Sequence, residues 1–158
     1  IGSAPEHLGQ SLYLREVHDA EIGPPPAVDL ERERQAGDLV RQLIEAEILT
    51  ACHDISDGGL LVALTEMAMA GRIGAELYVD TQEPAFWFGE DQGRYIVTTD
   101  RPEAVQQACH SAGIAYRMLG RTCGDQLLIG THTAISVERL RHLYENWLPR
   151  YINKDSIT

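Results

Sequence analysis

The chain has 158 residues, 44% of them hydrophobic, so it can bury a core without disulfides or metal ions. Its formal net charge is −11, and no cluster of lysines and arginines offsets it. Such a charge repels nucleic-acid phosphates and anionic lipids, so we expect no nucleic-acid partner. We also expect no membrane span and no signal peptide. No apolar run approaches the ~18 residues that a span needs, and the first residues lack a basic region followed by an apolar stretch.

The cysteines give an indication of the compartment. Cys52, Cys109 and Cys123 are odd in number and widely spaced, with no C-x-x-C motif. This spacing disfavours a disulfide framework and a structural zinc site. Reduced thiols are typical of the cytoplasm, which is where we expect the protein.

The first half of the chain contains a glycine- and proline-rich break between two predicted helices. A short helix over 12–17 precedes Gly23 and three prolines, which cannot continue a helix. A second helix is predicted over about 30–48, with Asp29 as its N-cap. A strand follows at 50–53, then a polar loop at 54–59. The apolar residues from Leu60 onward recur at helical spacing and predict a third helix.

The second half alternates strands and helices. Strands are predicted at 75–79 and 94–99, and a helix from Pro102 to Gly113. Alternating apolar residues at 114–118 predict another strand, followed by a turn at 120–125 and a strand at 126–129. Ser136 is expected to cap a last helix, which Pro149 should end.

This order of elements predicts an α+β fold. Connections of hairpin length and of crossover length both occur, which favours an α/β sandwich with one mixed sheet and helices packed on it. We expect a single domain over 1–158. It would comprise an opening segment at 1–28, an α/β core at 29–148 and a loose tail at 149–158.

The loop over 53–59, with the sequence HDISDGG, is the first candidate for a binding site. Asp54 and Asp57 are three residues apart, and Gly58 and Gly59 let a ligand approach the backbone. The helix that follows offers unpaired N–H groups and a positive dipole end. Such a loop can hold an anion directly or through Mg²⁺. Alternatively, Ser56 or Asp57 only caps the helix and the glycines only turn the chain.

The segment over 86–94, FWFGEDQGR, is the second candidate. Glu90 and Asp91 can ligate a metal, and Arg94 can pair with a phosphate or a carboxylate. The alternative is an aromatic anchor followed by a solvated turn, with Arg94 bridging to Glu90. The chain has no H-E-x-x-H and no G-x-S-x-G motif, so no catalytic residue is assigned.

Four segments together resemble a known family. They are LGQSLYLRE at 8–16, the Gly-Pro-Pro and Val-Asp-Leu stretches within 23–30, HDISDGGL with the following helix at 53–68, and FGEDQGRY at 88–95. In this order they resemble the last domain of the large subunit of phosphoribosylformylglycinamidine synthases, in the AIR synthase-related protein, C-terminal domain family. Beyond residue 95 only the general pattern is similar. The resemblance implies a fold like the C-terminal domain of aminoimidazole ribonucleotide synthase.

The resemblance also implies a function. The family's complete enzyme is a ligase of de novo purine biosynthesis. It uses ATP, Mg²⁺ and glutamine-derived ammonia to convert formylglycinamide ribonucleotide into the amidine. The phosphate or nucleotide contacts would then be Asp54, Ser56, Asp57, Gly58, Gly59 and Arg94, and the metal contacts Asp54, Asp57 and Glu90.

The implied partners are other parts of the same enzyme. They are the preceding domains of the subunit, a glutaminase subunit or domain and, in small-type enzymes, a small accessory subunit. Because the preceding domains supply most ATP and catalytic contacts in the family, we expect the isolated chain to be inactive. Two alternatives remain: a domain of a thiamine-monophosphate or selenide-type kinase, and a non-catalytic interaction module. The segments at 8–16 and 88–95 favour the synthase.

Overall fold

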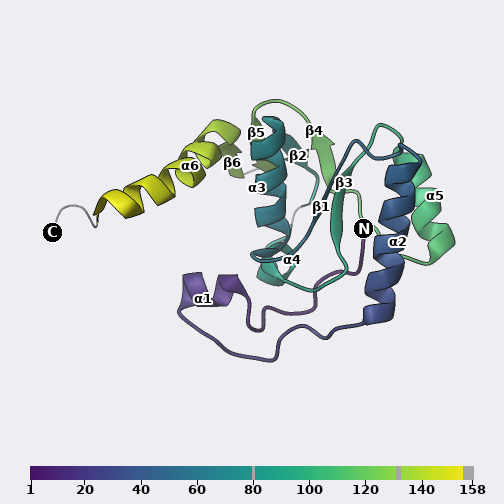
Figure 1. The fold of residues 1–158 in the computed structure, drawn as a ribbon, viewed down its shortest axis with the longest axis horizontal. Coiled ribbons are helices and arrows are strands. Elements are labelled where there is room, and N and C mark those ends of the chain that lie inside the picture. Colours follow the sequence, from purple (N-terminus) through teal and green to yellow (C-terminus); the bar gives the residue numbers. More distant parts are fainter. Residues whose placement is uncertain (80, 131–132, 155–158) are drawn as a thin grey trace. The chain divides into compact units, whose positions relative to one another are not determined.

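The computed structural model describes residues 1–79, 81–130 and 133–154, which form two compact units. The first unit comprises residues 1–64 and 81–118, and the second lies within 65–80 and 119–158. Helix α3 (Gly59–Gly71) begins in the first unit and continues in the second (Figure 1). None of the described helices combines the length and the hydropathy that a bilayer span requires.

The first unit is built around a two-stranded ladder and two packed helices. β1 (Ala51–Asp54) pairs antiparallel with β3 (Tyr95–Thr98), so that Asp54 lies opposite Tyr95. The core cluster consists of Leu39, Leu43, Val105 and Cys109. The helices of this unit, besides the start of α3, are α1 (Leu12–His18), α2 (Leu30–Glu45), α4 (Pro84–Phe88) and α5 (Pro102–Ala112).

Helix α2 begins where the sequence predicts. An Asp29 carboxylate oxygen accepts a hydrogen bond of 3.1 Å from the Arg32 N–H, which makes Asp29 the N-cap. Acidic residues in the first turn favour the positive end of the helix dipole. Leu39 and Leu43, four residues apart, share the face that packs against α5. Local sequence and burial therefore agree in this helix.

The second unit is a mixed four-stranded sheet with the order β4-β2-β5-β6. β2 (Ala75–Leu77) pairs parallel with β5 (Gln126–Ile129) and antiparallel with β4 (Gly120–Thr122), and β6 (Thr133–Ser136) pairs antiparallel with β5. The core cluster of this unit consists of Ala68, Leu127 and Val137. Helix α6 (Val137–Lys154) follows β6 directly, and the Ser136 hydroxyl accepts a bond of 3.2 Å from the Arg139 N–H, as predicted for its cap.

The predicted α+β class and the mixed sheet are confirmed, but the prediction of one sheet is wrong. The strands divide into the β1–β3 ladder and the four-stranded sheet. Strand propensity depends on how a residue fits a pleated surface, and it does not select the partner strand. Partner choice in this chain depends on packing between segments that are distant in sequence.

The predicted strand at 114–118 is also wrong, because these described residues form no ladder. Tyr116 and Met118 are 44% and 54% exposed, so their alternation does not correspond to a buried face. The strand lies instead at β4, within the predicted turn. Gly120 approaches the Glu76 carbonyl so closely that a Cβ would collide with it, which explains why a residue typical of turns starts this strand.

The loose tail predicted at 149–158 is only partly within the described residues. Helix α6 continues through Pro149 to Lys154, so the predicted stop at Pro149 is wrong, and residues 155–158 lie outside the described part. The rings of Trp147 and Tyr151 stack across the proline with centroids 5.4 Å apart. This contact joins the turns on either side of the position that cannot donate a backbone hydrogen bond.

Truncation of Leu43 tests the core of the first unit. Leu43 is 3% exposed and its helical neighbour Ile44 is 50% exposed. We expect Leu43→Ala to lower the free energy of unfolding by about 3 kcal/mol, because it leaves a cavity. Ile44→Ala, the matched control, should lower it by less than about 1 kcal/mol. Urea unfolding followed by the fluorescence of buried Trp87 measures both, and equal effects would contradict the packing described.

Candidate functional site

The acidic loop joins the end of β1 to the start of α3. Asp54 is the last residue of β1, and α3 begins at Gly59. Between them Ile55 is 8% exposed, and its N–H donates to the Arg94 carbonyl at 2.9 Å. The Gly59 N–H donates to the Ser56 carbonyl at 3.0 Å and closes the turn. The loop therefore lies at the positive end of a helix dipole, as the sequence predicts.

Both glycines of the loop are required by packing. Gly58 and Gly59 have φ angles of 79° and 72°, in the left-handed region that favours glycine. A Cβ on Gly59 would lie 2.7 Å from backbone atoms of Phe88, and one on Gly58 would lie 2.5 Å from the Val62 side chain. The loop backbone therefore lies in close contact with the C-terminal end of α4.

Glu90 connects the loop to the opening segment. Its Oε1 atom accepts hydrogen bonds from the Gly58 N–H at 2.8 Å and from the Leu12 N–H at 2.9 Å. Nearby, the rings of Tyr13 and Phe88 stack with centroids 4.4 Å apart. Three of the four segments that carried the family resemblance meet at this carboxylate. The sequence identified Glu90 as a candidate metal ligand and gave no signal for this contact.

Arg94 lies inside the same segment. Its side chain is buried, the residue being 6% exposed, and its Nη1 donates to the Gly89 carbonyl at 3.0 Å. Burial lowers the pKa of Arg94, and the negative charge of Asp91 opposes that shift. Arg94 therefore stabilises the turn through the Gly89 carbonyl. The sequence suggests an ion pair with Glu90 instead. The predicted contact with a phosphate would require the guanidinium to leave this position.

The exposed members of the predicted site are Asp54, Ser56 and Asp57. An Asp54 carboxylate oxygen lies 3.5 Å from Nδ1 of His53. Gly58 and Gly59, by contrast, are buried, and Glu90 is partly buried beneath its two amide contacts. The loop thus exposes two carboxylates and one hydroxyl to solvent, while the Glu90 side chain fixes its backbone at the Gly58 N–H.

The predicted metal ligands do not form a cluster in the structure. In residues 1–79, 81–130 and 133–154, no group of three or more His, Cys, Asp or Glu side chains could hold a metal ion. Asp54, Asp57 and Glu90 are therefore not assembled as one ligand set. Mg²⁺ typically takes one or two carboxylates and completes its shell with water and substrate phosphates. Its binding by Asp54 or Asp57 stays a prediction that needs ligands from elsewhere.

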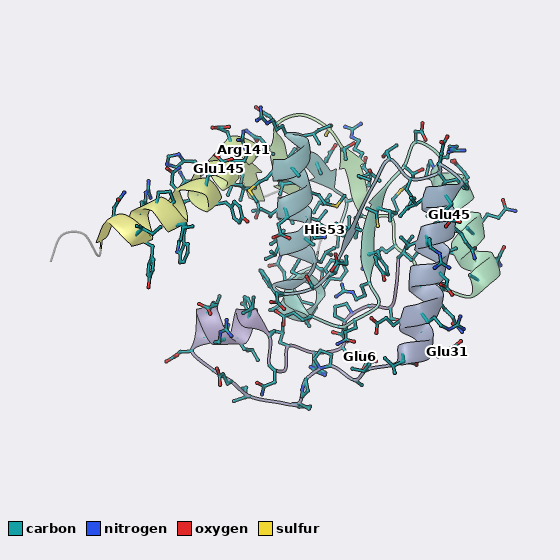
Figure 2. All side chains as sticks on the ribbon, viewed as in Figure 1. Glu6, Glu31, Glu45, His53, Arg141 and Glu145 are labelled. Atoms are coloured by element: carbon teal, nitrogen blue, oxygen red, sulfur yellow. The ribbon has the colours of Figure 1, made fainter. Side chains whose placement is uncertain are left out.

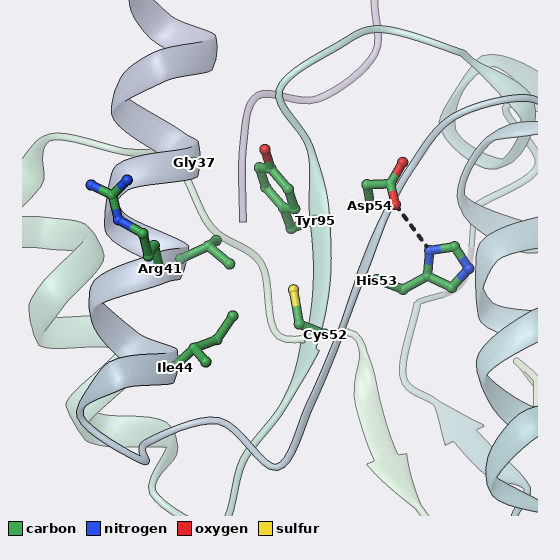
Figure 3. A pocket seen from close by; sticks show the side chains of 8 residues that line it. Gly37, Arg41, Ile44, Cys52, His53, Asp54 and Tyr95 are labelled. Carbon is green, nitrogen blue, oxygen red and sulfur yellow. Dashed lines mark ion pairs between the residues drawn. The ribbon is translucent and has the colours of Figure 1, made fainter.

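An open groove of about 630 Å³ borders the loop (Figure 3). It runs between α2 and the β1–β3 ladder, and Asp54 belongs to both the loop and the groove. The Tyr95 hydroxyl comes close to α2 at Gly37, where a Cβ would lie 3.3 Å away.

Cys52 is one of the residues that line this groove. Burial, reinforced by the charge of Asp54, raises the pKa of the Cys52 thiol. At neutral pH Cys52 is therefore a thiol and a poor nucleophile.

Comparison with known proteins assigns the family. Residues 1–132 match the family described as AIR synthase related protein, C-terminal domain. The chain belongs to this family. It is 52% identical over 155 residues to phosphoribosylformylglycinamidine synthase subunit PurL of Rhodospirillum rubrum, and 50% identical over 156 residues to that of Methylocella silvestris. Each match covers 96% of this chain and 21% of the relative, so the chain spans about a fifth of their length.

Solved structures of similar fold carry the same name. Thermotoga maritima PurL complexed with ATP superposes with a TM-score of 0.66 at 16% identity, covering 88% of this chain and 24% of that one. PurL of this organism complexed with FGAR gives a TM-score of 0.61 at 17% identity, over 73% of this chain and 22% of that one. At such identities the likeness shows the fold alone, and it agrees with the predicted family fold.

Glu90 variants test the connection between the loop and the opening segment. We expect Glu90→Ala to lower the free energy of unfolding by about 2 kcal/mol, because two partly buried N–H groups lose their acceptor. Glu90→Gln keeps a carbonyl acceptor and should lose less than half of that. Urea unfolding followed by Trp87 fluorescence separates the two. Equal losses would show that the Glu90 oxygen does not hold the loop.

Gly59→Ala tests the close approach of the loop to Phe88. The new Cβ would meet backbone at 2.7 Å from a φ of +72°, so we expect a loss of about 3 kcal/mol from strain and overpacking together. Gly113→Ala is the matched control, because Gly113 has a φ of +66° and no atom within 4 Å. It should cost about 1 kcal/mol from backbone strain alone. Similar unfolding midpoints for the two variants would contradict the packing.

Proposed function

We propose that this chain is the C-terminal domain of a phosphoribosylformylglycinamidine synthase subunit. In the complete enzyme, formylglycinamide ribonucleotide, ATP and glutamine-derived ammonia give formylglycinamidine ribonucleotide. The observation that carries the proposal is the 52% identity, over 96% of this chain, to a PurL subunit of that name. Similar folds occur in structures of PurL described as complexes with ATP, ADP, AMPPCP and FGAR, which supports a nucleotide-dependent reaction.

The exposed loop is the part of this domain that we propose contacts substrate. The dipole of α3 favours a phosphate beside the loop, whereas the carboxylates of Asp54 and Asp57 repel one unless a cation lies between. These two side chains would hold Mg²⁺, together with water and phosphate oxygens, in keeping with their exposure and oxygen chemistry. When bound, Mg²⁺ neutralises charge on the phosphates during transfer. The Ser56 hydroxyl would donate to a phosphate oxygen.

The buried residues of the loop and the turn have a positioning role in this proposal. Gly58 and Gly59 allow the backbone to lie against Phe88, and Glu90 fixes the Gly58 N–H. Arg94 braces the turn that carries Glu90. Their predicted contacts with ligand would then be indirect, through the shape of the loop.

The chain spans only about a fifth of its curated relatives, so the rest of the reaction requires other parts. We propose that the remaining domains of the subunit supply most ATP and catalytic contacts. A glutaminase would supply ammonia, and a small accessory subunit would complete small-type enzymes. A structure of PurLQS from Thermotoga maritima has a similar fold, with a TM-score of 0.63, which is in keeping with a multi-component enzyme. A cytoplasmic location remains part of this proposal.

Asp57→Asn in the complete subunit tests the role of the loop. We expect kcat/KM for ATP-dependent amidation to fall by about 100-fold, because one of the two carboxylates proposed to hold Mg²⁺ beside the transferring phosphate loses its charge. Asp125→Asn, on an exposed turn of the second unit, should leave it unchanged. ADP release and amidine formation are the measurements, with melting temperatures confirming that both variants fold. Unchanged turnover for Asp57→Asn, or turnover by the isolated 158-residue chain, would contradict the proposal.

A further inference from the structure

Helix α6 carries an apolar face that is buried in the first turn of the helix and exposed in the turns that follow. Val137 is 5% exposed and packs in the core of the second unit, and Leu140 lies against that core. Further along the helix the exposures rise to 50–69% at five large side chains at helical spacing. These residues, here called the apolar face of α6, are Leu143, Tyr144, Trp147, Leu148 and Tyr151.

The opposite side of α6 carries charged side chains that form ion pairs within the helix. Arg141 lies 2.7 Å from Glu145 and 3.8 Å from Glu138, and Figure 2 shows the first two side by side on the helix. The Asn146 amide donates to the His142 carbonyl at 2.8 Å. Helices that dock into a groove have this separation of apolar and polar faces. Trp and Tyr are also the residues enriched at the energetic centres of protein interfaces.

Among the described residues, Val137 and Leu140 in the first turn join α6 to the core of the second unit, and these contacts do not account for the length of the helix. Helices without tertiary packing are marginal in water, and an internal proline destabilises them further. Pro149 lies inside α6, and the Trp147–Tyr151 stack is a contact of the helix with itself. A surface that covers the apolar face would supply the missing stabilisation.

We infer that the apolar face of α6 docks against the part of the same synthase subunit that lies outside these 158 residues. This inference rests on the proposed function. The chain makes up 21% of the matched subunits, so they are about five times as long. The family match ends at residue 132, before α6, whereas the subunit matches cover 96% of the chain and so include most of α6. The helix therefore lies outside the matched family domain but within the region shared with whole subunits.

Covalent linkage favours this partner over a second copy or a separate protein. A docking surface on the same polypeptide has an effective concentration of about millimolar for short flexible connections. A second copy or a separate subunit must instead associate from solution and lose translational freedom. The apolar face carries no charge that would select a particular separate partner. Covalent linkage therefore favours a docking surface on the same polypeptide.

Photo-crosslinking in the complete subunit tests the inference. Trp147→p-benzoylphenylalanine is introduced into the full-length protein, which is irradiated in the presence of the glutaminase component, and crosslinked peptides are mapped by mass spectrometry. We expect crosslinks to peptides of the same subunit outside the 158 residues. Asn146→p-benzoylphenylalanine, one residue away on the polar side, is the matched control and should crosslink at least about tenfold less, since it faces solvent.

Each other result would overturn the inference. These are a covalent subunit dimer, a crosslink to the glutaminase, crosslinks confined to the 158 residues, and a yield no higher than that of the control. A second measurement does not depend on the probe: Trp147→Asp should speed amide hydrogen exchange in α6 of the complete subunit by at least about tenfold, and Asn146→Asp should not. Equal exchange would also overturn it.

Synthase turnover of the unsubstituted subunit is measured separately. Its absence would refute the proposed function whatever the crosslinks show. Turnover without the expected crosslinks would refute only the docking of α6.

Discussion

The site depends on one carboxylate oxygen that accepts two backbone N–H groups. Oε1 of Glu90 binds the amides of Gly58 and Leu12, residues 32 and 78 positions away in the sequence. A charged acceptor makes such bonds stronger than neutral ones. The two amides belong to the acidic loop and to the start of α1, so a single side chain sets the position of the loop relative to the opening segment. The close approach of Gly59 to Phe88 requires the same arrangement.

This arrangement divides the candidate site into two functional layers. Asp54, Ser56 and Asp57 are exposed and can meet a ligand, whereas Glu90 and Arg94 bond to backbone. A buried charged side chain without a hydrogen-bond partner would be costly in free energy. The buried side chains of this site therefore stay bonded to the backbone and fix its position. A loop held in this way offers its carboxylates in a fixed geometry, which suits a site completed by phosphates, water and other domains. The same division separates Glu90, which bonds to backbone amides, from the exposed carboxylates of Asp54 and Asp57.

Two features of the described residues are candidates for contact with other polypeptide. The first unit has an open groove that shares Asp54 with the loop, and the second unit extends into a helix with an uncovered apolar face. Exposed apolar faces of this kind mark interaction surfaces in soluble proteins. The curated relatives that the chain matches are about five times as long as these 158 residues.

The sequence alone determined the features that depend on neighbouring residues. The caps at Asp29 and Ser136, the ends of α5 at Pro102 and Gly113, and the position of the acidic loop before a helix all follow from local hydrogen bonding and backbone preference. The ordered motifs also identified the family. The sequence did not reveal contacts between distant segments, which decide the division into two sheets and the pairing of β4 in place of a turn. It also did not reveal that α6 continues past Pro149, where the Trp147 and Tyr151 rings stack within the helix. The roles of Glu90 and Arg94 belong to the same group, because a carboxylate or a guanidinium in a sequence is equally suited to a ligand and to a backbone amide or carbonyl. Only the tertiary structure shows which of these lies within hydrogen-bonding distance.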